Sequence, residues 1–171
     1  RIGLFYYEDI LERIPRNEIS KYECEFMKTF KKESPQTNTY YEIVGSYRRG
    51  AVNSGDIDVI ITSDDHSVFQ RIIDTLISKK MIIEVLSRGD TKCLVIAKLT
   101  PRSKARRVDF MFTSKAEYPF AILYFTGSKS FNTAMRGHSL NLGLSMNEHG
   151  FTKKDTQQKV VYENIITEKD I

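Results

Sequence analysis

The feature that most constrains the fold is the segment 56–62, in which acidic and branched aliphatic residues alternate. Side chains along a β-strand point to its two faces in turn, so a period of two places Asp56 and Asp58 on the same face. Ile57, Val59 and Ile61 share the other face. Such a strand requires a sheet with one dry face, and its two carboxylates lie near its beginning, away from the core.

A second segment, 106–112, repeats this pattern. Its apolar positions point one way, while Asp109 points the other way beside Arg107. If the two segments are neighbouring strands, Asp109 meets the earlier pair of acids. Other interpretations stay open at this point, because an Asp-x-Asp pair alone is typical of a solvated strand end and Asp109 alone could be a charge on an edge strand.

Helices and further strands account for the remaining chain. Apolar residues recur at spacings of three and four in 16–33 and in 66–80, which predicts two amphipathic helices. The buried stripe of the first helix is expected to comprise Ile19, Tyr22, Phe26, Met27 and Phe30. Strands are predicted at 41–46, 81–86, 91–99 and 106–113, and a helical region broken at 126–128 is predicted over 116–143. The predicted fold class is α+β: a mixed sheet covered by helices, followed by a small helical lobe with short strands.

The net charge and the cysteines indicate which kinds of binding partner to expect. Lys and Arg outnumber Asp and Glu by 26 to 22, and a pI near 9.0 is compatible with a polyanionic partner. Neither Cys24 nor Cys93 has a second Cys or His at metal-ligand spacing, so both are predicted to be core thiols in a reducing compartment. No apolar run approaches the roughly 18 residues that span a bilayer, and no membrane partner is expected.

The paired aspartates suit the chemistry of phosphates. Hard divalent cations such as Mg²⁺ take oxygen ligands and commonly use one or two carboxylates together with substrate phosphates. The Cα atoms of Asp56 and Asp58 should lie about 6.5–7 Å apart in an extended strand, which lets both side chains converge on ions about 3.5–4 Å apart. The segment therefore predicts a site for divalent cations.

The turn before this strand is rich in glycine and arginine. Gly45 and Ser46 form a turn whose backbone N–H groups and hydroxyl can face phosphate oxygens, and Arg48 and Arg49 add positive charge. Gly55 lets the backbone approach a ligand closely just before the first acid. Together these residues predict a phosphate-binding edge next to the cation site.

Several of these segments together resemble DNA polymerase family X, the polymerase beta group. The segments that stand in the family's order and approximate spacing are Arg13-Ile14-Pro15-Arg16, Gly45-Ser46-Tyr47-Arg48-Arg49-Gly50, Ser54-Gly55-Asp56-Ile57-Asp58, Arg106-Arg107-Val108-Asp109 and Tyr124-Phe125-Thr126-Gly127-Ser128. The Gly-Ser and Asp-x-Asp parts also mark other nucleotidyltransferases, whereas the Tyr-Phe-Thr-Gly-Ser run is far more specific. The resemblance covers the chain from about residue 1 to 171.

The resemblance implies roles for individual residues. Asp56 and Asp58 would be ligands of two Mg²⁺ ions, with Mn²⁺ as a candidate substitute, and Asp109 would bind the catalytic ion and help activate the primer 3′-hydroxyl. Nucleotide contacts are implied for Arg13, Ser46, Arg49, Ser54, Gly55, Tyr124, Phe125, Gly127, Lys129 and Asn132. DNA contacts are implied for Thr91, Lys92, Arg107 and Arg136. The bulk of Tyr124 and Phe125 would crowd a ribose 2′-hydroxyl and so favour deoxynucleotides.

The resemblance also implies a division of the chain and a set of partners. Residues 1–115 would be a nucleotidyltransferase-type catalytic palm with its entry helix, and residues 116–171 a nucleotide- and template-binding subdomain truncated at its C-terminus. Nothing in the sequence resembles the family's lyase domain, so a fragment or a reduced member is expected. The partners would be gapped or primer-template DNA and deoxynucleoside triphosphates, in the nucleus if the protein is cellular and in the cytoplasm or virion if it is viral.

Two residues depart from the family pattern. Lys129 stands where the family has an acid, which would alter contacts to the base. Met111 replaces a basic residue that the family uses to hold the third acid away from the metals in the open state. The family's open-to-closed switch is therefore not expected to apply unchanged.

The expected function is template-directed DNA polymerisation by two-metal nucleotidyl transfer, in short-gap filling during DNA repair. The alternatives are a nucleotidyltransferase acting on RNA ends or small molecules, and a non-catalytic nucleic-acid-binding module. Tyr124 and Phe125 argue against the first alternative, and the presence of all three acids argues against the second.

Overall fold

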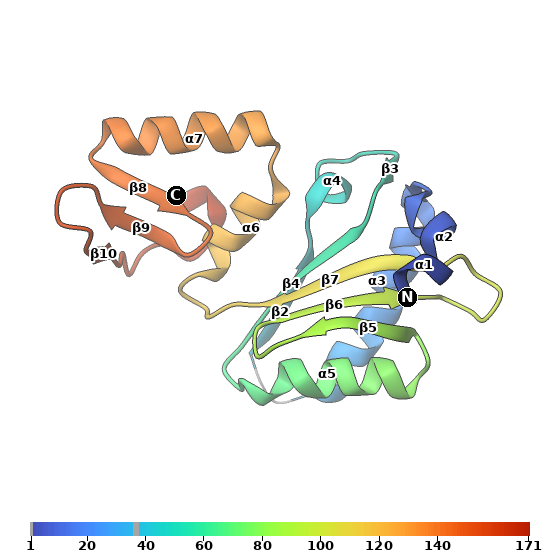
Figure 1. The fold of residues 1–171 in the computed structure, drawn as a ribbon. Coiled ribbons are helices and arrows are strands. Elements are labelled where there is room, and N and C mark those ends of the chain that lie inside the picture. The colour runs from blue at the N-terminus through green and yellow to red at the C-terminus, as the bar shows by residue number, and fades with distance from the viewer. Residues whose placement is uncertain (1, 36–37) are drawn as a thin grey trace.

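A five-stranded mixed sheet forms the larger part of the molecule. The computed structural model describes residues 2–35 and 38–171. The strands are β2 (Thr39–Ile43), β4 (Ile57–Ser63), β5 (Ile82–Arg88), β6 (Lys92–Ala97) and β7 (Arg106–Phe112), in the order β2-β4-β7-β6-β5. Only β4 and β7 run parallel among these neighbours, and the other pairs are antiparallel. This arrangement, drawn in Figure 1, confirms the predicted α+β class with a mixed sheet.

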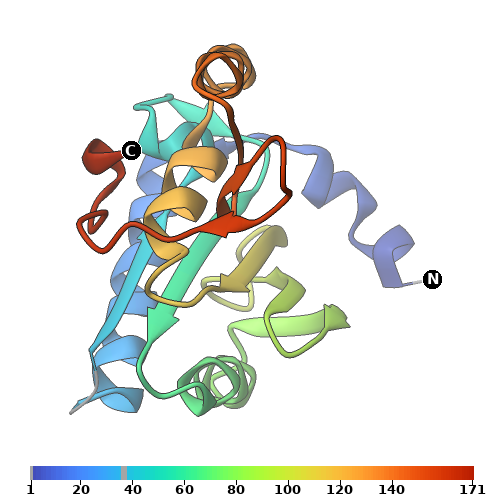
Figure 2. The ribbon, with the colours of Figure 1, turned by 90° about the vertical axis from the view of Figure 1, so that its left-hand side faces the viewer.

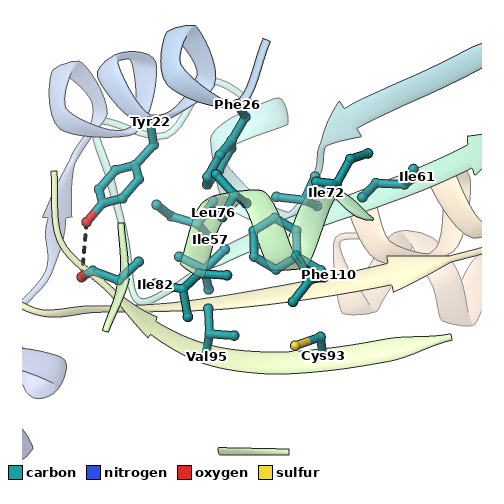
Figure 3. Packing of buried hydrophobic residues seen from close by; sticks show 14 of the residues in the cluster. Tyr22, Phe26, Ile57, Ile61, Ile72, Leu76, Ile82, Cys93, Val95 and Phe110 are labelled. Carbon is teal, nitrogen blue, oxygen red and sulfur yellow. Dashed lines mark hydrogen bonds between the residues drawn. The ribbon is translucent and has the colours of Figure 1, made fainter. Parts of the chain in front are cut away.

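Two helices, α3 (Arg16–Glu33) and α5 (Ser67–Ser78), pack with the sheet around one hydrophobic core. Figure 3 shows this core, in which Phe26 of α3 meets Phe110 of β7 edge to face, with ring centroids 5.4 Å apart. The hydroxyl of Tyr22 donates a hydrogen bond to the carbonyl of Ala97 at 3.2 Å, so its polar end is satisfied inside the core. The helix predicted over 16–33 is confirmed at both ends.

Two predictions about burial were wrong. Met27 was expected in the buried stripe of α3, but its side chain is 41% exposed. Cys24 was expected in the core and is exposed, whereas Cys93 is buried as predicted. The stripe of α3 is narrower than the apolar pattern suggested, since the sheet covers only the face that carries Ile19, Tyr22, Phe26 and Phe30.

Short elements connect the helices to the sheet. Helices α1 (Ile2–Phe5) and α2 (Tyr7–Leu11) precede β1 (Ile14–Pro15), which pairs antiparallel with β3 (Asn53–Ser54). The strand predicted over 41–46 ends at Ile43, and the turn that follows is a short helix, α4 (Gly45–Arg48). The glycine- and arginine-rich segment is therefore one helical turn at the end of β2.

A smaller lobe follows the sheet. It contains α6 (Tyr118–Thr126), α7 (Lys129–Asn141), the antiparallel sheet of β8 (Leu144–Asn147), β9 (Gly150–Lys153) and β10 (Lys159–Val160), and the 3₁₀ helix η1 (Glu168–Asp170). We call residues 1–115 the palm and residues 116–171 the second lobe, after the division expected from the sequence. Figure 1 shows α7 and the small sheet beyond α6, on the side away from α5.

Helix α6 joins the two parts. Its residues Ala121 and Ile122 form a small buried cluster with Val44 and Ile60 of the palm. Figure 2 shows α6 in front of the strands of the palm sheet. The contact explains why Ile60, which lies on the same face of β4 as Asp58, is only 1% exposed. The strict alternation of a dry and a wet face therefore holds at the start of β4 and ends where α6 covers the second face.

Across residues 2–35 and 38–171, no helix has the length and apolar character that crossing a membrane requires.

Candidate active site

The three predicted acids meet at one end of β4 and β7. The two strands are parallel neighbours, and their register places Asp58 directly beside Asp109, with Asp56 just before β4 begins. One carboxylate oxygen from each acid lies within 4.8 Å of the other two. The structure thus brings together the acids from segments that are about fifty residues apart in the sequence, as expected.

The charges of this cluster are unfavourable to one another. Burial, together with the nearby carboxylates of Asp56 and Asp109, raises the pKa of Asp58 to about 7. Burial also raises the pKa of Asp109, while Arg107, whose Nε lies 3.4 Å from Asp109 Oδ1, lowers it. Three crowded carboxylates of this kind form a donor set that a hard divalent cation prefers.

The Gly45 backbone passes close to the acids. Gly45 has a φ of +66°, and a Cβ atom built there would lie 3.3 Å from Asp58 Oδ2. A larger residue would therefore be strained by its conformation and would also crowd the carboxylate. Glycine at this position lets helix α4 begin directly over the acidic cluster.

The two predicted serines form a pair beside this turn. Ser46 Oγ and Ser54 Oγ are 2.6 Å apart, and Ser54 is 3% exposed. Ser54 lies on β3, two residues before Asp56. The structure therefore brings Ser46 to the same edge as the acids, where a hydrogen bond to the buried Ser54 positions its side chain.

Arg13 lies at this edge from the N-terminal side. Its Nε donates to Asn53 Oδ1 at 2.9 Å, and a Cβ built on Gly55 would lie 3.2 Å from Arg13 Nη1. The pairing of β1 with β3 positions Arg13 there. A side chain at position 55 would therefore push against the Arg13 guanidinium.

The end of α6 faces the same region. Arg49 Nη1 donates to the carbonyl of Thr126 at 2.7 Å, and a Cβ built on Gly127 would lie 3.2 Å from that nitrogen. Gly127 has a φ of +68°. Tyr124 and Phe125 pack edge to face, with ring centroids 4.9 Å apart. The structure thus joins the predicted phosphate-binding turn to the predicted sugar-binding run.

Helix α7 presents the next group of predicted residues. Asn132 Nδ2 donates to the Tyr124 carbonyl at 2.9 Å, and the Arg136 guanidinium lies 4.8 Å from the centroid of the Tyr124 ring. Arg136 Nη2 is also 3.9 Å from a carboxylate oxygen of Glu148. Lys129, at the first position of α7, is exposed. Two of the predicted contacts, Asn132 and Arg136, therefore lie against Tyr124.

Of the three predicted DNA contacts on the palm, Thr91 and Lys92 lie farther along the sheet from the acids. Lys92 pairs in register with Met111, two residues beyond Asp109, and Thr91 precedes it. Both line a small cavity of about 200 Å³ together with Met111 and Phe125. Arg107 is exposed on β7 beside Asp109. Thr91 and Lys92 therefore lie toward the second lobe, whereas Arg107 lies on the other side of Asp109 along β7.

The partners of Arg48 could not be foreseen from the sequence. Arg48 was expected to add positive charge to the turn, and in the structure its guanidinium binds Glu168, Thr126 and Glu42. Glu168 was not singled out from the sequence at all. Glu168 lies 120 residues from Arg48, and no local pattern marks it.

Comparison with known families covers most of the chain. The model of the DNA polymerase beta palm matches residues 13–115, and that of the DNA polymerase beta thumb matches residues 121–171. The palm match contains Asp56, Asp58 and Asp109, and the thumb match contains the Tyr124–Ser128 run.

Individual relatives agree with these matches. DNA polymerase lambda of Rattus norvegicus is 32% identical over 161 residues, which cover 88% of this chain and 28% of that protein. DNA polymerase lambda of Arabidopsis thaliana is 24% identical over 164 residues, covering 88% and 31%. The DNA polymerase/3′-5′ exonuclease PolX of Bacillus subtilis (strain 168) is 30% identical over 112 residues, covering 66% and 19%. This chain thus spans less than a third of each relative's length. From the palm match over residues 13–115, which holds the three clustered acids, it follows that the chain belongs to DNA polymerase family X.

Proposed function

We propose that this chain carries the nucleotide-transferring site of a template-directed DNA polymerase that fills short gaps during DNA repair. The observation that carries the proposal is the meeting of Asp56, Asp58 and Asp109 at one end of the parallel strands β4 and β7. Family membership and the polymerase names of the relatives support the same reaction class.

The acidic cluster fits divalent cations. Its ligand atoms are all carboxylate oxygens. Burial and the repulsion between the carboxylates raise the pKa of Asp58 to about 7, and a bound cation would stabilise the charged form. Asp56, Asp58 and Asp109 would hold Mg²⁺. Bound Mg²⁺ would supply positive charge where the triphosphate and the attacking hydroxyl meet.

The chain's own residues would then position the reactants. Asp109, whose pKa burial raises, would orient the primer 3′-hydroxyl and accept its proton on a carboxylate oxygen. Ser46 would donate to a phosphate oxygen from the turn over the acids, supported by Ser54. Arg49 uses Nη1 for Thr126, and its guanidinium has further donors suited to phosphate.

The two lobes would share the substrates. Tyr124, Phe125 and Gly127 would line the sugar, and Asn132 and Arg136 would approach the nascent pair from α7. Arg13, Gly55 and Lys129 complete the proposed nucleotide contacts. On the palm, Thr91 and Lys92 near the second lobe and Arg107 beside Asp109 would contact the primer side of the DNA. The palm would thus carry the chemistry, and the second lobe would bind nucleotide and template.

The direct test is extension of a labelled primer across a one-nucleotide gap with deoxynucleotides and Mg²⁺. The wild type should add the templated nucleotide, and Asp109→Ala should lower the rate by about 10³-fold. The matched control is Asp90→Ala, which removes an exposed acid outside the cluster and should leave the rate unchanged. Equal extension by the wild type and Asp109→Ala would reject the mechanism.

The same assay separates the alternatives. Addition of ribonucleotides without a template would indicate a nucleotidyltransferase acting on RNA ends or small molecules. Binding of gapped DNA without any turnover by the wild type would indicate a nucleic-acid-binding module.

A further inference from the structure

Arg48 joins three separate segments through one guanidinium group. Its Nη1 and Nη2 lie 2.9 and 2.5 Å from the two carboxylate oxygens of Glu168. Nη1 also donates to Thr126 Oγ1 at 3.0 Å, and Nε donates to Glu42 Oε1 at 3.3 Å. Arg48 therefore ties helix α4 to strand β2, to the end of α6 and to η1.

The geometry of this contact is that of a specific ion pair. Two guanidinium nitrogens face two carboxylate oxygens, a forked arrangement that arginine forms and lysine cannot reproduce. The side chains of Arg48 and Glu168 are only 27% and 24% exposed. Partial burial reduces solvent screening, so this pair should be stronger than the exposed ion pairs of the surface.

The contact lies between the two halves of the proposed site. On one side, Arg48 is the last residue of the helix that begins with Gly45 and Ser46 over the acids. On the other side, Thr126 directly follows the sugar-lining residues Tyr124 and Phe125. Arg49 Nη1 donates a hydrogen bond to the backbone carbonyl of the same residue, Thr126. The adjacent arginines thus hold one residue of α6 by its hydroxyl and by its carbonyl.

We propose that Arg48 is a positioning residue, which with Glu168 sets the distance between the Gly45–Arg48 turn and the Tyr124–Gly127 run. This inference rests on the proposed function, because it assigns those two segments to the phosphates and the sugar of one nucleotide. Arg48 itself would contact neither the phosphates nor the sugar, because its guanidinium nitrogens already bind protein groups. Its effect is on the alignment of the pocket.

The kinetic consequence follows from that indirect role. Arg48→Gln and Glu168→Gln should each raise KM for the incoming deoxynucleotide about tenfold, with kcat changed less than about threefold, because ground-state alignment is lost while the acids remain. Arg48→Lys should resemble Arg48→Gln, since an ammonium lacks the fork. The exchange of charges in Arg48→Glu with Glu168→Arg should recover part of the lost affinity.

A second ion pair provides the control. Arg88 binds Asp74 at 2.8 Å on the opposite part of the palm, with the arginine 30% exposed. Arg88→Gln removes a comparable guanidinium without touching α4, α6 or η1, and it should leave KM and kcat unchanged.

Hydrogen–deuterium exchange provides a readout independent of turnover. In Arg48→Gln, the amides of residues 167–171 should exchange at least about tenfold faster, because η1 loses its tie to the palm. The amides of β4 and β7 should keep their wild-type protection. Arg88→Gln should show neither change.

The outcomes separate the two proposals. A wild type that does not incorporate nucleotides would reject the proposed polymerase function, while faster exchange at 167–171 would still support the tie through Arg48. A wild type that is active, with Arg48→Gln matching it in nucleotide KM, would overturn the positioning role, even if the melting temperature falls. Loss of kcat at unchanged KM would also overturn it, because that result would place Arg48 at the reacting groups.

Discussion

The palm and the second lobe are stabilised in different ways. The large hydrophobic cluster lies wholly within the palm, between the five-stranded sheet and helices α3 and α5. In the second lobe, α7 buries only Ser139 and β8 buries no residue. The lobe is held to the palm by the four-residue cluster around Ile60 and by polar ties such as Arg48 with Glu168. Burial of apolar area is the larger stabilising term, so we expect the second lobe to open first.

This difference suits the proposed reaction. The acids need a fixed scaffold, because small displacements of catalytic groups are costly to rate. Under the proposed function the second lobe would have to admit and release substrates, and a lobe held by a few contacts can move while the palm stays folded. The predictions that follow test this contrast, from the largest expected effect to the smallest.

Removing an aromatic ring from the palm core should have the largest effect on stability. Phe110 is 1% exposed and contacts Phe26. Phe110→Ala should lower the free energy of unfolding by about 4 kcal/mol, since it leaves a cavity among rigid neighbours. Urea denaturation followed by circular dichroism measures it. A loss under about 1 kcal/mol would contradict the account of a tightly packed palm.

The equivalent change in the second lobe should act locally. Phe120, at 7% exposed, packs edge to face on Phe151. Phe120→Ala should lower the free energy of unfolding of the second lobe by about 3 kcal/mol. The amides of β8 and β9 should then exchange faster, while those of β4 and β7 remain protected. Exchange measured by mass spectrometry checks this. Equal loss of protection in both lobes would show that they unfold as one unit, and the contrast would then be wrong.

The acidic face should make the metal-free palm less stable as pH rises. In the folded chain the pKa of Asp58 is raised to about 7, so the folded state binds a proton more tightly than the unfolded state. The free energy of unfolding therefore falls as pH rises above about 4 and through the folded pKa of about 7. Between pH 5.5 and pH 8 the expected fall is about 2 kcal/mol. Thermal melting in EDTA across this range measures the loss. Asp58→Asn should flatten the dependence, and Mg²⁺ should restore stability at pH 8.

A surface ion pair in the second lobe should matter least. Lys159 Nζ lies 2.9 Å from Glu117 Oε1, and the lysine is 53% exposed. Lys159→Gln should lower stability by about 0.5 kcal/mol or less, because water screens the pair. Denaturation at two salt concentrations tests this, and a loss above about 1.5 kcal/mol would mean that the second lobe depends on exposed charges.

The same contrast governs how much could be predicted from the sequence. Within the palm, periodicity predicted α3 and the alternating strands, and the two acidic segments implied a meeting that the register of β4 and β7 confirms. These features follow from local patterns and one buried face. The roles of the individual site residues stay predictions, since proximity alone does not show what each residue binds.

Long-range features could not be predicted in this way. Nothing local shows that α6 covers Ile60, that Cys24 points to solvent, or that Arg48 binds Glu168. Each of these three features depends on how segments that are distant in the sequence pack against one another. From its neighbours in the sequence, Arg48 was expected only to add positive charge to the turn, whereas in the folded chain its guanidinium binds Glu168, Glu42 and Thr126.

The central claim is that nucleotidyl transfer requires the clustered carboxylates of Asp56, Asp58 and Asp109. Single-turnover incorporation of one deoxynucleotide into gapped DNA at saturating Mg²⁺, by the wild type and by Asp109→Asn, tests it most directly. Asparagine keeps the shape of the side chain and removes the charge. We predict a fall of about 10³-fold in the rate, with circular dichroism and gapped-DNA affinity unchanged. A rate within threefold of the wild type would contradict the account.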